Sequence, residues 1–243
     1  MVYFYYSPFI IRLKNMKTVV IIPAYNEEKS ISSVINDIPK ERVSEVIVVN
    51  NCSTDRTTEF AEKAGATVLY ENQMGYGAAC LNGIDYLESK GFDLVVFLDG
   101  DYSDYPEEIN LLIDPIISGE YDFVLGSRVL GKRAKGALPV QSRIGSVIAG
   151  FFINLFWHVR FTDLGPFRAI KYDKLIELNM EDKWFGWTIE MQIKAAKRKY
   201  KIKEVPVSYR KRIGKSKVTG TIKGSVMAGV IILKTIFVQL FKD

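Results

Sequence analysis

Short apolar runs recur through the first half of the chain, and each one ends in glycine, asparagine or carboxylate side chains. Runs of this length, bounded by turn signals, are typical of strands that are buried on both faces. The predicted strands cover residues 18–22, 45–49, 67–70, 95–98 and 123–125. Helices are predicted between them, up to about residue 38, at 56–64, at 78–89 and from 106 onward. This alternation predicts an α/β domain with a mostly parallel central sheet and flanking helices.

The second half of the chain begins with a long apolar segment at residues 143–161, which predicts a helix. Its polar side chains, including His158, the only histidine of the chain, fall on one narrow stripe, so we assign that histidine a structural role. Pro206 favours an edge position or a bulge for the strand that contains it. After the long helix we expect a turn-rich loop at residues 162–168 and a helix at residues 187–199. The strand with Pro206 is expected at residues 201–209, and a basic loop at residues 210–217.

The last apolar segment, residues 222–241, is long enough to span a bilayer but contains Lys234. A lysine within a span is unfavourable, and Lys223 lies on the same edge of the helix as Lys234. We therefore expect a helix that lies in a membrane interface, with burial against the domain as the alternative. Three segments result: an N-terminal extension (1–15), an α/β domain (16–218) and a C-terminal amphipathic membrane-associated helix (219–243).

Two carboxylates, Asp99 and Asp101, follow the apolar run at 95–98 with only Gly100 between them. Open α/β sheets bind ligands at the carboxyl ends of their strands, so we expect these carboxylates at a binding edge. Two carboxylates this close repel each other unless a cation lies between them. Mg²⁺ or Mn²⁺ that bridges a diphosphate is the candidate cation, because hard cations take oxygen ligands. The alternative is a polar turn that starts the next helix. Asp104, shortly before Pro106, is expected to cap that helix rather than to bind the metal.

Individual residues exclude two common nucleotide-binding loops. A dinucleotide-binding fold needs glycines after its first strand, whereas this chain has Pro23, which offers no N–H to a pyrophosphate. A P-loop is excluded because Tyr209 stands where its first glycine belongs, although Gly214-Lys215-Ser216 matches its end. Gly75 and Gly77 permit close backbone approach at a helix N-terminus, which favours anions; an ordinary loop is the alternative.

Composition narrows the class of protein. Apolar residues make up 48% of the 243 residues, which is enough for a folded core and excludes a disordered chain. The formal net charge of +5 suits an anionic substrate, anionic lipid or nucleic acid. Cys52 and Cys80 have no ligand-like spacing and are expected to be free thiols in a reducing compartment. The segment 1–12 carries its positive charge after its apolar residues, which does not match a signal peptide.

Several polar motifs follow predicted strands in a recognisable order: Pro23-Ala24-Tyr25-Asn26-Glu27, Asn51-x-Ser53-Thr54-Asp55, Gly75-x-Gly77, Asp99-Gly100-Asp101 and Gly126-Ser127-Arg128. The set resembles family 2 glycosyltransferases of the GT-A (Rossmann-like) fold, over about residues 17–218. Two later motifs, Asp163–Arg168 and Arg212-x-x-Gly214-x-Ser216-Lys217, are similar to those of the polyprenol (dolichol) phosphate hexosyltransferase branch. Asn50 and Asn51 replace the two aspartates of many mannosyl enzymes, at a position that helps to bind the nucleoside. The motif Asp163–Arg168 looks closer to the glucosyl-like members, so we favour a UDP-glucose-like donor, with GDP-mannose second.

The resemblance implies a nucleotide-sugar site built from Pro23, Ala24, Tyr25, Glu27, Asn51, Asp55, Gly75, Asp99 and Gly100. It implies that Asp101 holds Mg²⁺ or Mn²⁺ directly, and that Asp99 binds the metal or the donor. A metal at this place would neutralise the leaving diphosphate. The catalytic group that follows from this is Asp99, Asp101, Arg128 and Arg212.

The implied acceptor is a polyprenyl phosphate, which is already ionised near neutral pH and can attack the anomeric carbon with inversion, without a general base. Such a site needs cations to hold the phosphate, and arginine suits bidentate contact. The residues expected there are Arg128, Arg143, Ser146, Arg212 and Lys217, whereas Lys211 and Lys215 are expected to be solvated. Asp163, Arg168 and Glu190 are expected to brace this region.

Two other functions stay open on the sequence alone. The same fold could transfer the sugar to a hydroxyl acceptor in glycan or glycolipid assembly, with Asp104 or Asp163 as the general base. A non-enzymatic nucleic-acid-binding protein is supported only by the basic stretch at 194–217, without any recognised motif, so no nucleic-acid partner is expected. A polyprenyl acceptor stays in the membrane, which places the expected enzyme on the cytoplasmic membrane face.

Overall fold

The computed structural model describes residues 16–214 and 222–242. The N-terminal extension and residues Lys215, Ser216 and Lys217 of the basic loop lie outside this part. A seven-stranded sheet crosses the domain in the order β3-β2-β1-β4-β6-β5-β7. Its strands are β1 (Thr18–Ala24), β2 (Glu45–Asn51), β3 (Thr67–Glu71), β4 (Leu94–Phe97), β5 (Phe123–Ser127), β6 (Arg168–Lys171) and β7 (Ile202–Pro206).

The sheet is parallel except at β6, which runs antiparallel to its neighbours β4 and β5. Every strand other than β6 therefore presents its carboxyl end at the same edge, where the predicted polar motifs meet. β7 closes the sheet on one side, which confirms the edge position predicted from Pro206. The sequence pattern missed β6, because this four-residue strand begins with Arg168 and ends with Lys171 and so has no apolar run.

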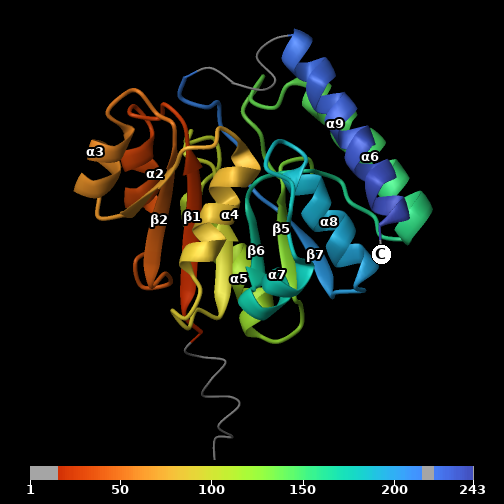
Figure 1. The fold of residues 1–243 in the computed structure, drawn as a ribbon, viewed down its shortest axis with the longest axis horizontal. Helices are drawn as coiled ribbons and strands as arrows, with labels where there is room; N and C mark the ends of the chain where they lie inside the picture. Colours follow the sequence, from red (N-terminus) through yellow and green to blue (C-terminus); the bar gives the residue numbers. More distant parts are fainter. Residues whose placement is uncertain (1–15, 215–221, 243) are drawn as a thin grey trace, which may run out of the picture.

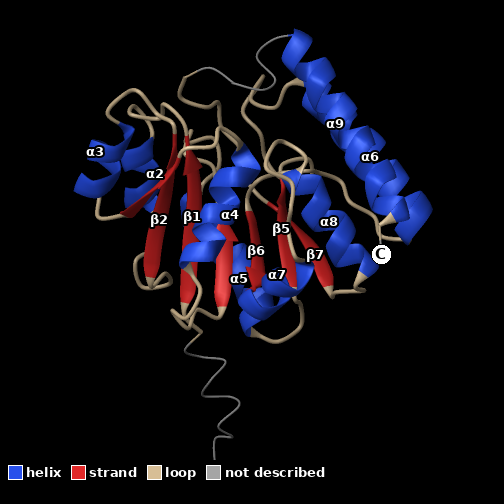
Figure 2. Cartoon of the chain, in the orientation of Figure 1, coloured by secondary structure: helices blue, strands red, loops and turns tan. Residues whose placement is uncertain are grey.

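Helices cover both faces of the sheet, as the burial of alternate strand residues requires (Figure 2). In β1, Val20 and Ile22 belong to the core on one face, and Val19 and Ile21 belong to the core on the other. The first face is covered by α2 (Ile31–Asp37), α3 (Thr57–Lys63) and α5 (Ile109–Ile117), the last preceded by the short 3₁₀ helix η1 (Pro106–Glu108). The second face is covered by α4 (Tyr76–Tyr86), α7 (Tyr172–Leu178) and α8 (Trp187–Lys197).

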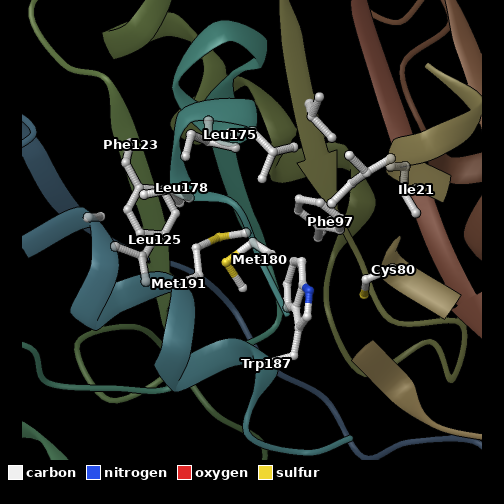
Figure 3. Packing of buried hydrophobic residues seen from close by; sticks show 14 of the residues in the cluster. Ile21, Cys80, Phe97, Phe123, Leu125, Leu175, Leu178, Met180, Trp187 and Met191 are labelled. Carbon is white, nitrogen blue, oxygen red and sulfur yellow. The ribbon is translucent and has the colours of Figure 1, made fainter. Parts of the chain in front are cut away.

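The core of the second face is built around Trp187 at the start of α8 (Figure 3). Its indole is fully buried and meets the ring of Phe97 edge to face, with centroids 4.6 Å apart. Met180 and Met191 lie close by in the same cluster. Because Phe97 is the last residue of β4, this packing fixes the strand end from which Asp99 and Asp101 emerge.

Two long helices, α6 (Val140–Trp157) and α9 (Ile222–Phe241), lie side by side outside α8 (Figure 1). Phe152 of α6 and Phe237 of α9 meet with ring centroids 6.3 Å apart. Ile236 and Gln239 of α9 are buried, so the helix packs against the domain along one side. Its outer side keeps large apolar residues exposed, and among the described residues no helix is long and apolar enough to cross a membrane.

Candidate active site

A cavity of about 470 Å³ opens at the carboxyl edge of the sheet. Residues from the ends of β1, β2, β4 and β5 line it, together with the loops that follow these strands. It brings together most of the residues singled out from the sequence: Pro23, Ala24, Tyr25, Glu27, Asn51, Gly75, Asp99, Gly100, Asp101, Arg128 and Arg212. The strand-end motifs, which are far apart in the chain, therefore meet at one cavity.

A second cavity of about 240 Å³ adjoins the first and extends between α6 and α9. Ser146 lines it, as do Gly145 of α6 and Gly229 of α9. The residues that line both cavities are Tyr76, Asp99, Arg128, Ser142 and Phe185. The site is thus a two-chambered cavity whose junction lies at the first carboxylate of the Asp-x-Asp motif.

Two predicted site residues, Arg143 and Asp55, lie elsewhere, and a third is not described. Arg143 is exposed on α6 and lines neither cavity, and Lys217 lies outside the described residues. Asp55 accepts hydrogen bonds from the backbone N–H groups of Glu28 and Thr57, so it holds two loops of the site together. Burial raises the pKa of Asp55, but the hydrogen bonds from Thr57 outweigh it and leave this pKa lowered.

The carboxylate pair at the end of β4 is surrounded by groups that stabilise negative charge. Asp101 is buried and accepts hydrogen bonds from the N–H and hydroxyl of Ser103, and an Arg212 nitrogen lies 2.8 Å from its other oxygen. Burial, reinforced by the charge of Asp101, raises the pKa of Asp99 to about 7, against the opposing charges of Arg212 and Arg128. A further positive charge beside Asp99 would relieve the repulsion between the Asp99 and Asp101 carboxylates.

Arg128 and Asp163 form a buried ion pair below the junction of the cavities. Two guanidinium nitrogens of Arg128 approach the two carboxylate oxygens at 2.7 and 2.8 Å, and the Arg128 backbone N–H donates at 2.9 Å. Ser146 donates its hydroxyl hydrogen to the same carboxylate at 3.1 Å. Burial raises the pKa of Asp163, but pairing with Arg128 outweighs it and leaves the pKa lowered. Asp163 therefore braces Arg128 and Ser146, the role expected from the sequence.

Asp104 does not cap a helix, which corrects the expectation from the sequence. The residue before η1 is Tyr105, and η1 has no side-chain cap. Asp104 is instead 1% exposed, and neither carboxylate oxygen has a hydrogen-bond partner among the described residues. Burial and the nearby charge of Asp99 raise its pKa well above the usual range. The sequence pattern Asp-x-Pro-Glu could not reveal this, because burial of Asp104 depends on segments that are distant in the sequence.

Glu190 and Arg168 hold the second half of the site in place, as expected. The Glu190 carboxylate accepts hydrogen bonds from the backbone N–H groups of Glu181 and Asp182 and lies 2.7 Å from the Lys194 ammonium. Arg168 is fully buried and donates to the carbonyl oxygens of Thr188 and Gly165. Burial lowers its pKa to about 10.

The glycines at the start of α4 serve a contact that the sequence did not predict. The N–H groups of Gly77 and Ala78 donate to the carbonyl oxygens of Trp184 and Lys183, at 3.1 and 2.9 Å. These two N–H groups are therefore used within the chain rather than offered to an anion. Trp184 and Phe185 line the first cavity and were not singled out from the sequence, where the Trp-Phe-Gly-Trp run was the available signal.

Asn51 supports the same region, because its side-chain amide makes three hydrogen bonds there. It donates to the carbonyl oxygens of Glu71 and Gln73 and accepts the N–H of Gly75 at 2.8 Å. Asn51 therefore fixes the loop between β3 and α4 at the wall of the cavity.

Comparison with known proteins identifies the family. A sequence model described as "Glycosyl transferase family 2" matches residues 19–177. Glycosyltransferase AglJ of Haloferax volcanii is 32% identical over 192 residues, covering 78% of this chain and 62% of AglJ. An undecaprenyl-phosphate mannosyltransferase of Micrococcus luteus is 28% identical, covering 88% of this chain and 93% of that enzyme. A UDP-N-acetylglucosamine–dolichyl-phosphate N-acetylglucosaminyltransferase of Methanococcus voltae is also 28% identical, with 77% and 83% covered.

The fold has solved counterparts. Glucosyl-3-phosphoglycerate synthase from Mycobacterium tuberculosis, crystallised with Mn²⁺, UDP-glucose and phosphoglyceric acid, superposes with a TM-score of 0.76 at 20% identity. The superposition covers 97% of this chain and 86% of that one. The predicted α/β class and the resemblance to family 2 glycosyltransferases are both confirmed. The alternative of a non-enzymatic nucleic-acid-binding protein is therefore rejected. The chain belongs to glycosyl transferase family 2 and is a glycosyltransferase that uses a nucleotide sugar.

Proposed function

We propose that the enzyme transfers a hexose from a nucleotide sugar, UDP-glucose-like in preference to GDP-mannose, to a polyprenyl (dolichyl) phosphate with inversion. The observation that carries this proposal is the pair of adjoining cavities that share Asp99 and Arg128. One chamber has carboxylates for a metal and diphosphate, and the other extends between two helices that expose apolar residues. The names of the Micrococcus luteus and Methanococcus voltae relatives, which act on polyprenyl phosphates, support the same acceptor class.

The donor side of the proposal rests on the first cavity. Tyr25 lines its wall and can pack on a base, while Glu27 lines it with a carboxylate that can accept hydrogen bonds from hydroxyl groups. Glucosyl-3-phosphoglycerate synthase, which shares the fold, was crystallised with UDP-glucose. The two asparagines at 50 and 51 place a neutral pair where many mannosyl enzymes have aspartates, which favours UDP over GDP.

The donor set fits Mg²⁺ or Mn²⁺. Asp99 and Asp101 are oxygen donors that line the cavity, and the ion pair between Asp101 and Arg212 indicates that this place attracts positive charge. Either ion would be held by these two carboxylates and would stabilise the negative charge of the departing diphosphate. Glucosyl-3-phosphoglycerate synthase was likewise crystallised with Mn²⁺ or Mg²⁺.

A phosphate acceptor fits the residues of the second cavity better than a hydroxyl acceptor does. A hydroxyl needs a general base, and the two carboxylates considered for that role do not suit it. Asp163 is locked in a bidentate pair with Arg128, and Asp104 is buried and lines neither cavity. Arg128 and Arg212 instead supply positive charge, which orients an ionised phosphate for attack.

We further propose that α6 and α9 place the enzyme on the cytoplasmic membrane face. Among their described side chains, they expose twelve large apolar residues, here called the apolar ridge: Val140, Ile144, Val147, Ile148, Phe151 and Leu155 on α6, and Met227, Val230, Leu233, Phe237, Val238 and Phe241 on α9. Many exposed apolar residues on two neighbouring helices suit insertion into a lipid headgroup region. The second cavity extends between the same two helices, so a lipid phosphate held there would keep its tail near the membrane.

The test is turnover with detergent-solubilised polyprenyl phosphate and UDP-glucose or GDP-mannose in the presence of Mn²⁺. We expect a polyprenyl-phosphate hexose product from the wild type, and loss of about two orders of magnitude or more in rate for Asp101→Asn. Asp85→Asn, an exposed substitution on α4, is the matched control and should keep the wild-type rate. Equal rates for Asp101→Asn and the wild type would reject the role of the carboxylate pair.

A further inference from the structure

The segment 181–186, here called the aromatic loop, presents two large aromatic side chains at the site. Trp184 is 48% exposed and Phe185 is 37% exposed, and both line the first cavity. Exposed aromatic rings that line a cavity leave apolar surface in water until a ligand covers it. The aromatic loop therefore marks a surface for a ligand with an apolar face.

The aromatic loop is held from two sides, so its backbone has a fixed position. At its start, Glu190 accepts the N–H groups of Glu181 and Asp182, and the Asp182 carboxylate accepts the N–H of Trp184 at 2.7 Å. At its middle, the backbone of Lys183 and Trp184 accepts hydrogen bonds from the first turn of α4. A rigid aromatic surface loses little conformational entropy when a ligand binds.

Gly77 allows this attachment. A Cβ atom at Gly77 would meet the backbone of Asp182 and Lys183 far inside contact distance, because the two chains approach closely. Gly75 is under the same restriction from the Lys183 carbonyl, and its φ of +151° is one that side chains rarely adopt. The two glycines thus position the aromatic loop against the wall of the cavity.

The junction of the two cavities is the place that the transferred sugar must occupy. In the proposed reaction the hexose is bonded first to the diphosphate on the donor side and afterwards to the phosphate on the acceptor side. It must therefore contact residues that line both cavities, and of these only Phe185 has a wholly apolar side chain. Trp184 lies beside it on the donor side.

We infer that Phe185, with Trp184 beside it, forms the hexose subsite and packs against the apolar C–H face of the donor sugar. This inference rests on the proposed function. The aromatic face carries negative charge density and the C–H bonds of a pyranose point positive hydrogens at it, so the contact adds to simple burial. Phe185 would hold the sugar while the acceptor phosphate attacks its anomeric carbon.

The experiment measures binding of UDP and of UDP-glucose, with Mn²⁺, by isothermal titration calorimetry; GDP and GDP-mannose replace them if the wild type prefers guanine. Phe185→Leu and Trp184→Leu are expected to weaken UDP-glucose about three- to tenfold and to leave UDP unchanged. Unchanged UDP affinity also shows that each variant is folded. Tyr70→Leu, which removes an exposed aromatic ring outside both cavities, is the matched control and should change neither ligand.

Gly77→Ala provides a second test, because it displaces the aromatic loop without touching its rings. We expect it to weaken UDP-glucose and to spare UDP, as Phe185→Leu does. If Phe185→Leu weakens both ligands equally, or neither, the hexose subsite is refuted. Failure of the proposed function would differ, because the wild type itself would then bind neither nucleotide sugar, and the subsite would be rejected with it.

Discussion

The buried pair of Arg128 and Asp163 offers the most quantitative test of the structure. Asp163→Asn leaves the shape of the side chain but removes the charge that balances the guanidinium. The Asp163 side chain is 1% exposed and that of Arg128 is 12% exposed, so water can do little to replace the lost partner. Removing one partner of such a pair costs about 3–5 kcal/mol. Because Arg128 keeps some contact with the cavity, we expect a loss of about 3 kcal/mol.

The assay is urea unfolding followed by circular dichroism at pH 7. Asp163→Asn should unfold at a clearly lower urea concentration, whereas Glu177→Gln, which breaks an exposed pair with Lys174, should keep the wild-type midpoint. The double variant Arg128→Met, Asp163→Leu should recover part of the loss, because no guanidinium then stays buried without its partner, while the backbone N–H of Arg128 and the hydroxyl of Ser146 lose their acceptor. A difference below about 1 kcal/mol between Asp163→Asn and the wild type would refute a desolvated pair.

The same pair predicts a direction for the pH dependence. Since pairing with Arg128 lowers the pKa of Asp163 in the folded state, the unfolded chain binds more protons at this site in moderately acidic solution. The stabilisation is complete above the usual pKa range of aspartate and is lost as the pH falls through the folded pKa. The urea midpoint of Asp163→Asn should therefore fall less steeply with acid than that of the wild type.

Three further predictions concern single features. Asp104→Asn should stabilise the metal-free chain against urea more at pH 8 than at pH 4. Burial raises the pKa of Asp104, so ionisation of this carboxyl group costs the wild type more stability as the pH rises. The opposite trend would contradict a carboxylate without hydrogen-bond partners among the described residues. In the absence of donor, the Arg212→Met variant should bind Mn²⁺ severalfold more tightly than the wild type, as measured by calorimetry. The reason is that the Arg212 guanidinium, which pairs with Asp101, competes with the metal for this carboxylate. Weaker binding by the variant would contradict this competition. The double variant Val147→Glu, Phe151→Glu should reduce the amount of enzyme that sediments with anionic vesicles at least tenfold. Leu111→Glu, on the opposite face of the sheet, should leave this amount unchanged. An equal loss of vesicle binding in both variants would contradict docking by the apolar ridge.

The regular part of the fold could be predicted because its signals are local. Each central strand is an apolar run buried on both faces, so hydrophobicity alone marks it, as in β1 and β4. Each is followed by turn-forming residues, and parallel strands bring those turns to one edge, which is why Asp99, Asp101 and Arg128 could be placed together in advance. The sequence analysis missed β6, which has a charged residue at each end, and the seven-residue helix α7, because such short segments take their structure from their neighbours.

The sequence by itself determined the alternating strands and helices of the first half of the chain and the polar residues that meet at the carboxyl edge of the sheet, because both follow from periodicity and strand direction. Only the tertiary structure decided which polar groups face the cavity and which face one another. It turned Asp104 inward, paired Asp163 with Arg128, and used Gly77 to hold the aromatic loop rather than an anion. These outcomes depend on contacts between segments tens of residues apart, whose close packing and burial no local pattern encodes.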